Sequence, residues 1–133
     1  MTPVFADSGY YVALLLQTDQ DHDRAVEVTL RLQNPIVTSA WILTEVANTF
    51  SAPRFRGAFV SLLDDLQADP NVRIIAPEPG IFTQGIELYR SRADKSWSLT
   101  DCVSFVVMQR EQITESLTGD HHFEQAGFKA LLR

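Results

Sequence analysis

Short apolar runs alternate with amphipathic stretches along this chain. Runs such as Val4–Ala6 and Val72–Ala76 are too short for helices and are bounded by polar or turn-forming residues, which predicts buried strands. Between the runs, apolar residues recur at spacings of three and four, which predicts helices that bury one face. Strands that alternate with helices indicate an α/β fold. We expect a three-layer α/β/α sandwich whose central parallel sheet has four or five strands.

The bounds of these elements follow from residues that start and stop helices. Ser8, Asp21 and Ser39 precede helical patterns and are of the types that cap helix N-termini, and Pro53 and Pro79 suit a first helical position. The expected strands are Val4–Ala6, Pro35–Thr38, Val72–Ala76, Glu115–Thr118 and Phe128–Leu131. The expected helices are Gly9–Gln17, His22–Gln33, Ser39–Phe50, Pro53–Asp69, Pro79–Arg92 and Thr100–Gln112.

Composition favours one globular domain over residues 1–133. Of the 133 residues, 45% are apolar, which suffices for a core, and no linker or repeat divides the chain. No apolar run approaches the roughly 20 residues of a membrane span, and the first residues lack the basic region of a secretory signal. We therefore expect a cytoplasmic protein without a membrane partner. The single cysteine, Cys102, excludes a disulfide framework.

Four acidic residues stand alone in long uncharged stretches. Asp7 is the only charge before Asp19, and Glu45, Asp101 and Asp120 are similarly isolated. An acid in apolar sequence tends to be partly buried, where it must become protonated, pair with a cation or bind a metal. Because no basic residue shares these stretches, a divalent cation is the expected partner. Asp7 and Asp120 also follow expected strands, at the edge where α/β sheets bind ligands.

Each acid also has a structural interpretation. Asp101 follows Ser98 by three residues, the spacing of a capping box, and Asp7 and Asp120 could be turn or cap residues. Glu45 is harder to explain this way. Its neighbours one helical turn away offer no cation and are Trp41, Ile42, Asn48 and Thr49. One shared cation site explains all four acids more simply than four separate roles.

The motifs around these acids resemble those of the PIN domain, the metal-dependent ribonuclease fold of VapC-type toxins in toxin–antitoxin pairs. Val-Phe-Ala-Asp7-Ser8 is similar to the family's opening motif, and Thr44-Glu45-Val46 to its internal glutamate. The segment 94–105 resembles the longest and most diagnostic motif, and 118–128 resembles the closing one. Gly9 stands where the family frequently has a hydroxyl residue. The resemblance covers essentially the whole chain and implies that Asp7, Glu45, Asp101 and Asp120 are the catalytic, metal-binding acids.

The resemblance also implies an activity and partners. The activity would be hydrolysis of RNA phosphodiester bonds by metal-activated water, leaving 5′-phosphate and 3′-hydroxyl ends. Mg²⁺ or Mn²⁺ fits, because both prefer oxygen ligands and leave coordination positions for phosphate. The implied partners are an RNA substrate, a small antitoxin protein and a second copy in a homodimer. The apolar faces of the helices at His22–Gln33 and Pro53–Asp69 are the expected partner groove.

Other polar residues are candidates for substrate binding. Ser8 and Thr100 adjoin acids and could orient them or the substrate. The net charge of −6 argues against a broad basic surface, so phosphate contacts would depend on local cations such as Arg92 and Lys95. His121 and His122 could contact metal or substrate, or lie solvated in a loop.

Two alternatives stay open, and the sequence argues against a third. One is a housekeeping PIN nuclease that acts on other RNA or on DNA, and another is a non-catalytic PIN-fold binding module, which would be expected to lose some acids. A phosphoacceptor signalling domain would need an acceptor aspartate after a central strand and a lysine after a late one. The third strand here ends at Ala76-Pro77, and no lysine directly follows the fourth.

Overall fold

The structure, a computed structural model, describes residues 1–133 and contains one five-stranded sheet in the order β3-β2-β1-β4-β5. All neighbouring strands run parallel. The strands are β1 (Val4–Ala6), β2 (Ile36–Ser39), β3 (Val72–Ile75), β4 (Glu115–Leu117) and β5 (Lys129–Ala130). Each expected strand is present, and the predicted parallel sheet is confirmed with five strands.

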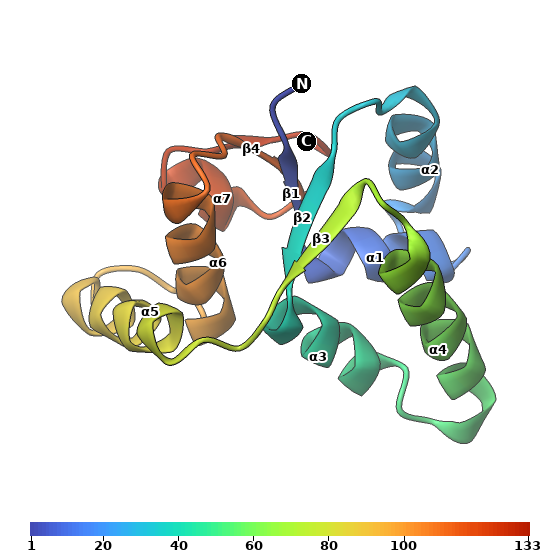
Figure 1. Cartoon of the computed structure of the whole chain (residues 1–133), viewed down its shortest axis with the longest axis horizontal. Helices are drawn as coiled ribbons and strands as arrows, with labels where there is room; N and C mark the ends of the chain where they lie inside the picture. The colour runs from blue at the N-terminus through green and yellow to red at the C-terminus, as the bar shows by residue number, and fades with distance from the viewer.

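Helices cover both faces of this sheet. They are α1 (Ser8–Leu15), α2 (His22–Arg31), α3 (Ala40–Thr49), α4 (Pro53–Ala68), α5 (Pro79–Ser91), α6 (Leu99–Arg110) and α7 (His121–Gln125). Figure 1 shows α1, α2 and α4 on one side of the strands and α5, α6 and α7 on the other, so the predicted three-layer arrangement is confirmed. None of the helices combines the length and hydropathy that crossing a bilayer requires.

Two helix starts differ from the sequence prediction. The N-cap of α1 is Asp7, whose carboxylate accepts a hydrogen bond from the Ser8 N–H at 2.8 Å, so Ser8 is the first helical residue and not the cap. Asp21 precedes α2 but makes no side-chain capping bond, because its backbone is not in the extended conformation that a capping side chain needs. Ser39 does cap α3, accepting from the Ile42 N–H at 3.2 Å.

The strand order creates a switch point between β1 and β4. From β1 the chain moves outward through β2 to β3, and it then returns to add β4 and β5 on the other side of β1. Ligands of open α/β sheets bind outside the carboxyl ends of the strands at such a point. Asp7 directly follows β1, and Thr118 directly follows β4. The fold therefore brings the start and the end of the chain together at this edge.

Gly85 sets the close packing of α5 on α6. A Cβ atom at this buried position would lie 2.6 Å from Cγ2 of Val103 and 3.3 Å from its Cα, so only glycine permits this approach. On its other face α6 packs on the core, where the Phe105 and Phe123 rings meet edge to face at 5.0 Å. This packing fixes the start of α6, where Asp101 lies.

Candidate active site

Asp7 is the most buried of the four acids. Its carboxylate accepts hydrogen bonds from the Ser8 N–H at 2.8 Å and from the Thr118 hydroxyl at 2.7 Å. The pKa of Asp7 is nevertheless raised to about 7. Burial is the main cause, the neighbouring Asp101 and Glu45 carboxylates add to the rise, and the two hydrogen bonds oppose it. Two of the other acids therefore lie close enough to Asp7 to disfavour its charge.

Glu45 finds a partner in a hydroxyl group. It lies on α3, half-buried, and its Oε1 accepts a hydrogen bond of 2.7 Å from the Ser8 Oγ. The expected need for a partner is thus met by the first residue of α1 and not by a basic side chain. Ser8 also donates its backbone N–H to Asp7, so it bonds to two of the acids and fixes their side chains relative to each other.

Asp101 has the capping role that its spacing from Ser98 indicated. The Ser98 hydroxyl accepts from the Asp101 N–H at 3.0 Å, and Oδ2 of Asp101 accepts from the Ser98 N–H at 3.1 Å, which completes a capping box. Burial raises the pKa of Asp101. Its hydrogen bonds all involve Oδ2, so Oδ1 is left without a protein donor. The structural role and a cation-binding role are therefore compatible.

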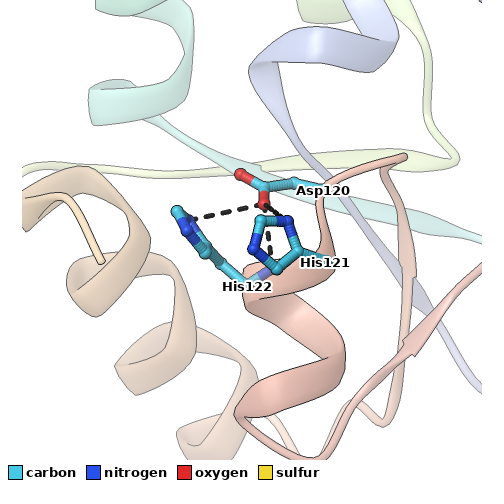
Figure 2. Close-up of side chains that lie close together, drawn as sticks. All are labelled: Asp120, His121 and His122. Carbon is cyan, nitrogen blue, oxygen red and sulfur yellow. Dashed lines mark hydrogen bonds and ion pairs between the residues drawn. The ribbon is translucent and has the colours of Figure 1, made fainter. Parts of the chain in front are cut away.

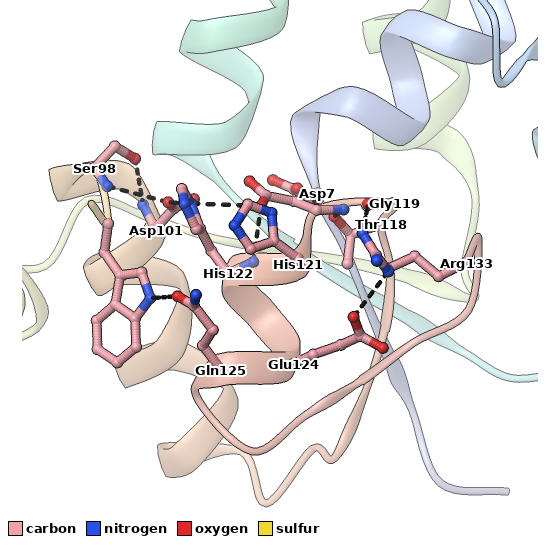
Figure 3. Close-up of polar contacts among 12 residues, drawn as sticks. Asp7, Ser98, Asp101, Thr118, Gly119, His121, His122, Glu124, Gln125 and Arg133 are labelled. Carbon is pink, nitrogen blue, oxygen red and sulfur yellow. Dashed lines mark hydrogen bonds and ion pairs between the residues drawn. The ribbon is translucent and has the colours of Figure 1, made fainter. Parts of the chain in front are cut away.

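Asp120 lies with His121 and His122 (Figure 2), and the two histidines lie beside Asp101 (Figure 3). Asp120 caps α7, accepting from the His122 N–H at 2.8 Å. Nδ1 of His122 lies 3.0 Å from Oδ2 of Asp101 and 3.4 Å from Oδ1 of Asp120. Oδ1 of Asp120 also lies 3.7 Å from Nδ1 of His121. The loop position considered for the histidines is wrong, because both lie in the first turn of α7.

Thr118 is a site residue that the sequence reasoning missed. Its hydroxyl donates to Asp7 at 2.7 Å and accepts from the Asp120 N–H at 3.0 Å, which joins the ends of β1 and β4 across the switch point. The sequence does carry a signal for this residue. Thr118 stands directly after a strand and two residues before an acid, and hydroxyls in such positions commonly bond to the backbone N–H two residues on.

The four substrate-binding candidates fall in two places. Ser8 lies between Asp7 and Glu45, and Thr100 lies in the first turn of α6, half-buried and without a side-chain hydrogen bond. Arg92 is the C-cap residue of α5, and Lys95 lies in the loop that leads into α6. The Arg92 guanidinium makes two hydrogen bonds of 3.0 Å to Asp94, whose carboxylate raises the pKa of Arg92. Lys95 has no ion pair.

The donor atoms at this edge fit a hard divalent cation. Carboxylates supply most of them, which is the chemistry that Mg²⁺ and Mn²⁺ prefer, and a cation would offset the repulsion among Asp7, Glu45 and Asp101. Ligand atoms of Asp120, His121 and His122 also lie within 4.8 Å of one another, which adds imidazole nitrogens. Imidazole nitrogens are more typical ligands of zinc, iron, nickel and copper than of Mg²⁺.

Solved structures with the same fold include a toxin. VapC20 of Mycobacterium tuberculosis, a sarcin-ricin loop cleaving toxin, superposes with a TM-score of 0.86 at 22% identity, covering 94% of this chain and 95% of that one. VapBC2 of Rickettsia felis, bound to a DNA fragment from their promoter, gives 0.68 at 14% identity over 96% of each chain. FitAcB of Neisseria gonorrhoeae gives 0.66 at 17% identity, over 96% of this chain and 94% of that one.

At these identities the likeness shows the fold alone. A search of curated protein sequences gave no match. The family model of the PIN domain matches residues 4–129, and the chain therefore belongs to the PIN domain family.

Proposed function

We propose that this protein is a metal-dependent endoribonuclease with its active site at the switch point between β1 and β4. The observation that carries the proposal is Asp7, a buried carboxylate whose pKa is raised to about 7 and which faces the charges of Asp101 and Glu45. A strongly perturbed acid at the ligand-binding edge of an α/β sheet is a marker of function. Mg²⁺ or Mn²⁺ is the proposed cofactor.

The proposed roles follow from the contacts of each side chain. Asp7, Glu45, Asp101 and Asp120 hold the cation, and Ser8 and Thr118 fix the orientation of Asp7 by donating to its two oxygens. A bound divalent cation would lower the pKa of water and offset negative charge on the scissile phosphodiester. Ser8 and Thr100 line the approach to the acids, and Arg92 and Lys95 supply positive charge on the α5–α6 side. His122 orients Asp101 and Asp120 through its Nδ1.

Cleavage of RNA in the presence and absence of chelator tests this proposal. We expect a labelled single-stranded or structured RNA to be cut when Mn²⁺ or Mg²⁺ is supplied and to stay intact in excess EDTA, because removal of the cation removes the group that activates water. Sequencing of the products would show 5′-phosphate ends. Cleavage that persists in EDTA would contradict the metal-nuclease proposal, and absence of cleavage with either metal would favour a PIN-fold binding module.

We further propose that the protein is the toxin of a toxin–antitoxin pair and forms a homodimer. Family membership supports this, as do apolar side chains on α2 and α4 that the chain itself leaves uncovered, Leu30 at 82% and Val60 at 52% exposure. Beside Val60 lies a cavity of about 290 Å³ lined by Phe50 and Phe59. Multi-angle light scattering should give twice the chain mass. A monomeric mass at micromolar concentration would contradict the dimer, and lack of a small gene directly upstream would favour a housekeeping nuclease.

A further inference from the structure

A basic cavity opens between the end of α5 and the loop that leads into α6. Its volume is about 430 Å³, and its lining includes three cations, Arg90, Arg92 and Lys95, but no acid. The chain as a whole carries a net charge of −6. A lining of this sign on an acidic protein is a local exception, and it favours an anionic ligand.

The three cations differ in how much of their charge is available. Arg92 is held by two hydrogen bonds to Asp94, and its guanidinium lies over the Trp97 ring, 5.1 Å from the centroid. Arg92 and Trp97 therefore form a fixed wall of the cavity. Arg90 and Lys95 make no ion pair and no side-chain hydrogen bond. Their charges are free to bind an anion.

An aromatic side chain completes the cavity. Tyr89 lines it and is 54% exposed. Trp97 is only 6% exposed, and its Nε1 donates to Gln125 at 3.0 Å. Its ring is buried and therefore not accessible to a ligand. Tyr89 is thus the ring in this lining that is open for stacking.

The cavity lining reaches the first turns of α6, the helix that carries Asp101. Cys102 is part of its lining, and Cys102 directly follows Asp101 on α6. Gly85 and Val103 hold α5 against α6, which keeps this side of the cavity rigid. A ligand in the cavity and a phosphodiester at the acids could belong to the same strand.

From these contacts we propose that the cavity binds one nucleotide of single-stranded RNA next to the scissile phosphate, with its base stacked on Tyr89 and its phosphate held by Arg90 and Lys95. A pocket of a few hundred Å³ is of ordinary size for a small ligand, and stacking combined with cationic side chains is how proteins bind single strands. The inference rests on the proposed ribonuclease function and names the part of the substrate that this surface holds.

RNA binding in EDTA tests the proposal without cleavage. Fluorescence anisotropy of a labelled single-stranded RNA would be measured for the parent, Tyr89→Ala and Tyr89→Phe, with Phe82→Ala as the matched control, since Phe82 is 44% exposed on the same helix but outside the cavity. Loss of a stacked base costs about tenfold or more in affinity. We expect that loss for Tyr89→Ala, while Tyr89→Phe and Phe82→Ala bind like the parent.

The salt dependence separates stacking from charge. Arg90→Ala and Lys95→Ala should each lower the slope of log affinity against log salt by about 0.7, the value for one phosphate contact on a single strand. Tyr89→Ala should leave the slope unchanged. Arg54→Ala is the matched control, because Arg54 is exposed on α4 and makes no ion pair. A hexaglutamate peptide should not displace the RNA, since it carries charge but no base.

Several results would overturn the proposal. They are parent-like RNA binding by Tyr89→Ala, equal losses for Arg90→Ala and Arg54→Ala, displacement by hexaglutamate, or no RNA binding by the parent. Because binding is read in EDTA, the two proposals fail separately. Pocket-dependent binding without cleavage in Mn²⁺ would refute the nuclease alone, and cleavage with unaltered binding by the Tyr89 and Arg90 variants would refute the pocket alone.

Discussion

Replacement of Asp7 by asparagine is expected to abolish RNA cleavage and, at the same time, to make the metal-free protein more stable. Burial raises the pKa of Asp7 to about 7, so at about pH 8 the folded protein carries a charge that its surroundings disfavour. One pKa unit corresponds to about 1.4 kcal/mol. Asparagine avoids that charge but turns an amide nitrogen toward the Thr118 hydroxyl. We expect the free energy of unfolding to rise by roughly 1–3 kcal/mol and cleavage to fall at least about 1000-fold.

The pH dependence of this gain has a definite sign. In the unfolded chain Asp7 ionises near its ordinary pKa of 3.8, whereas in the folded protein it keeps its proton up to a pKa of about 7. The stability that Asp7 contributes is therefore fully present below about pH 4 and is lost as the pH rises through about 7. Urea unfolding at several pH values should show parent and Asp7→Asn diverging over this window.

Asp120→Asn is the control for this prediction. The Asp120 side chain is 36% exposed, so its charge costs the fold little, and we expect lost cleavage without comparable stabilisation. If Asp7→Asn cleaves RNA like the parent and is less stable than the parent, Asp7 has only a capping role.

The alternation of strands and helices was predictable because each element depends on a pattern in its own short stretch of sequence. Each strand is a short apolar run, and each long helix has a periodic apolar face, so Val4–Ala6 and the other strands were located to within two residues at either end. The four acids were selected as candidates for a related reason. A charge is rarely placed in apolar sequence unless the fold gives it a partner.

Helix α7 was not predicted because five residues are too few to show a periodic face. Its ends nevertheless carry recognisable signals. Asp120 is a suitable N-cap, and Gly127 has a φ of 95°, a left-handed conformation that favours glycine. The N–H groups of Gly127 and Phe128 bond to the carbonyls of Glu124 and Phe123, which is a Schellman motif.

The contacts inside the site were beyond sequence reasoning because they join distant segments. Ser8 and Glu45 are 37 residues apart, and Asp7 and Thr118 are 111 residues apart. No local sequence pattern predicts that a hydroxyl group after β4 will contact an acid after β1. The strand order determines this contact, since it places β4 beside β1 at the switch point.

Manganese is expected to raise the melting temperature of the parent, and to raise it more at about pH 8 than at about pH 6. A cation that binds only the folded state at 100 times its dissociation constant stabilises that state by about 2.7 kcal/mol. Binding requires ionised carboxylates, and the raised pKa of Asp7 means that protons compete with the cation below about pH 7. One pH unit below this pKa, the affinity should fall about tenfold, which removes roughly 1.4 kcal/mol of the stabilisation.

Two variants show whether this stabilisation comes from the proposed site. Asp101→Asn removes the charge of a proposed ligand, and we expect its melting temperature to be nearly unchanged by manganese at either pH. The double variant Asp64→Asn and Asp65→Asn removes two exposed carboxylates from α4 that are not among the proposed ligands, and should respond to manganese like the parent. Differential scanning fluorimetry over a manganese titration measures both. An equal shift in Asp101→Asn and in the parent would place the cation elsewhere on the protein, because a site that includes Asp101 cannot keep its affinity after losing that charge.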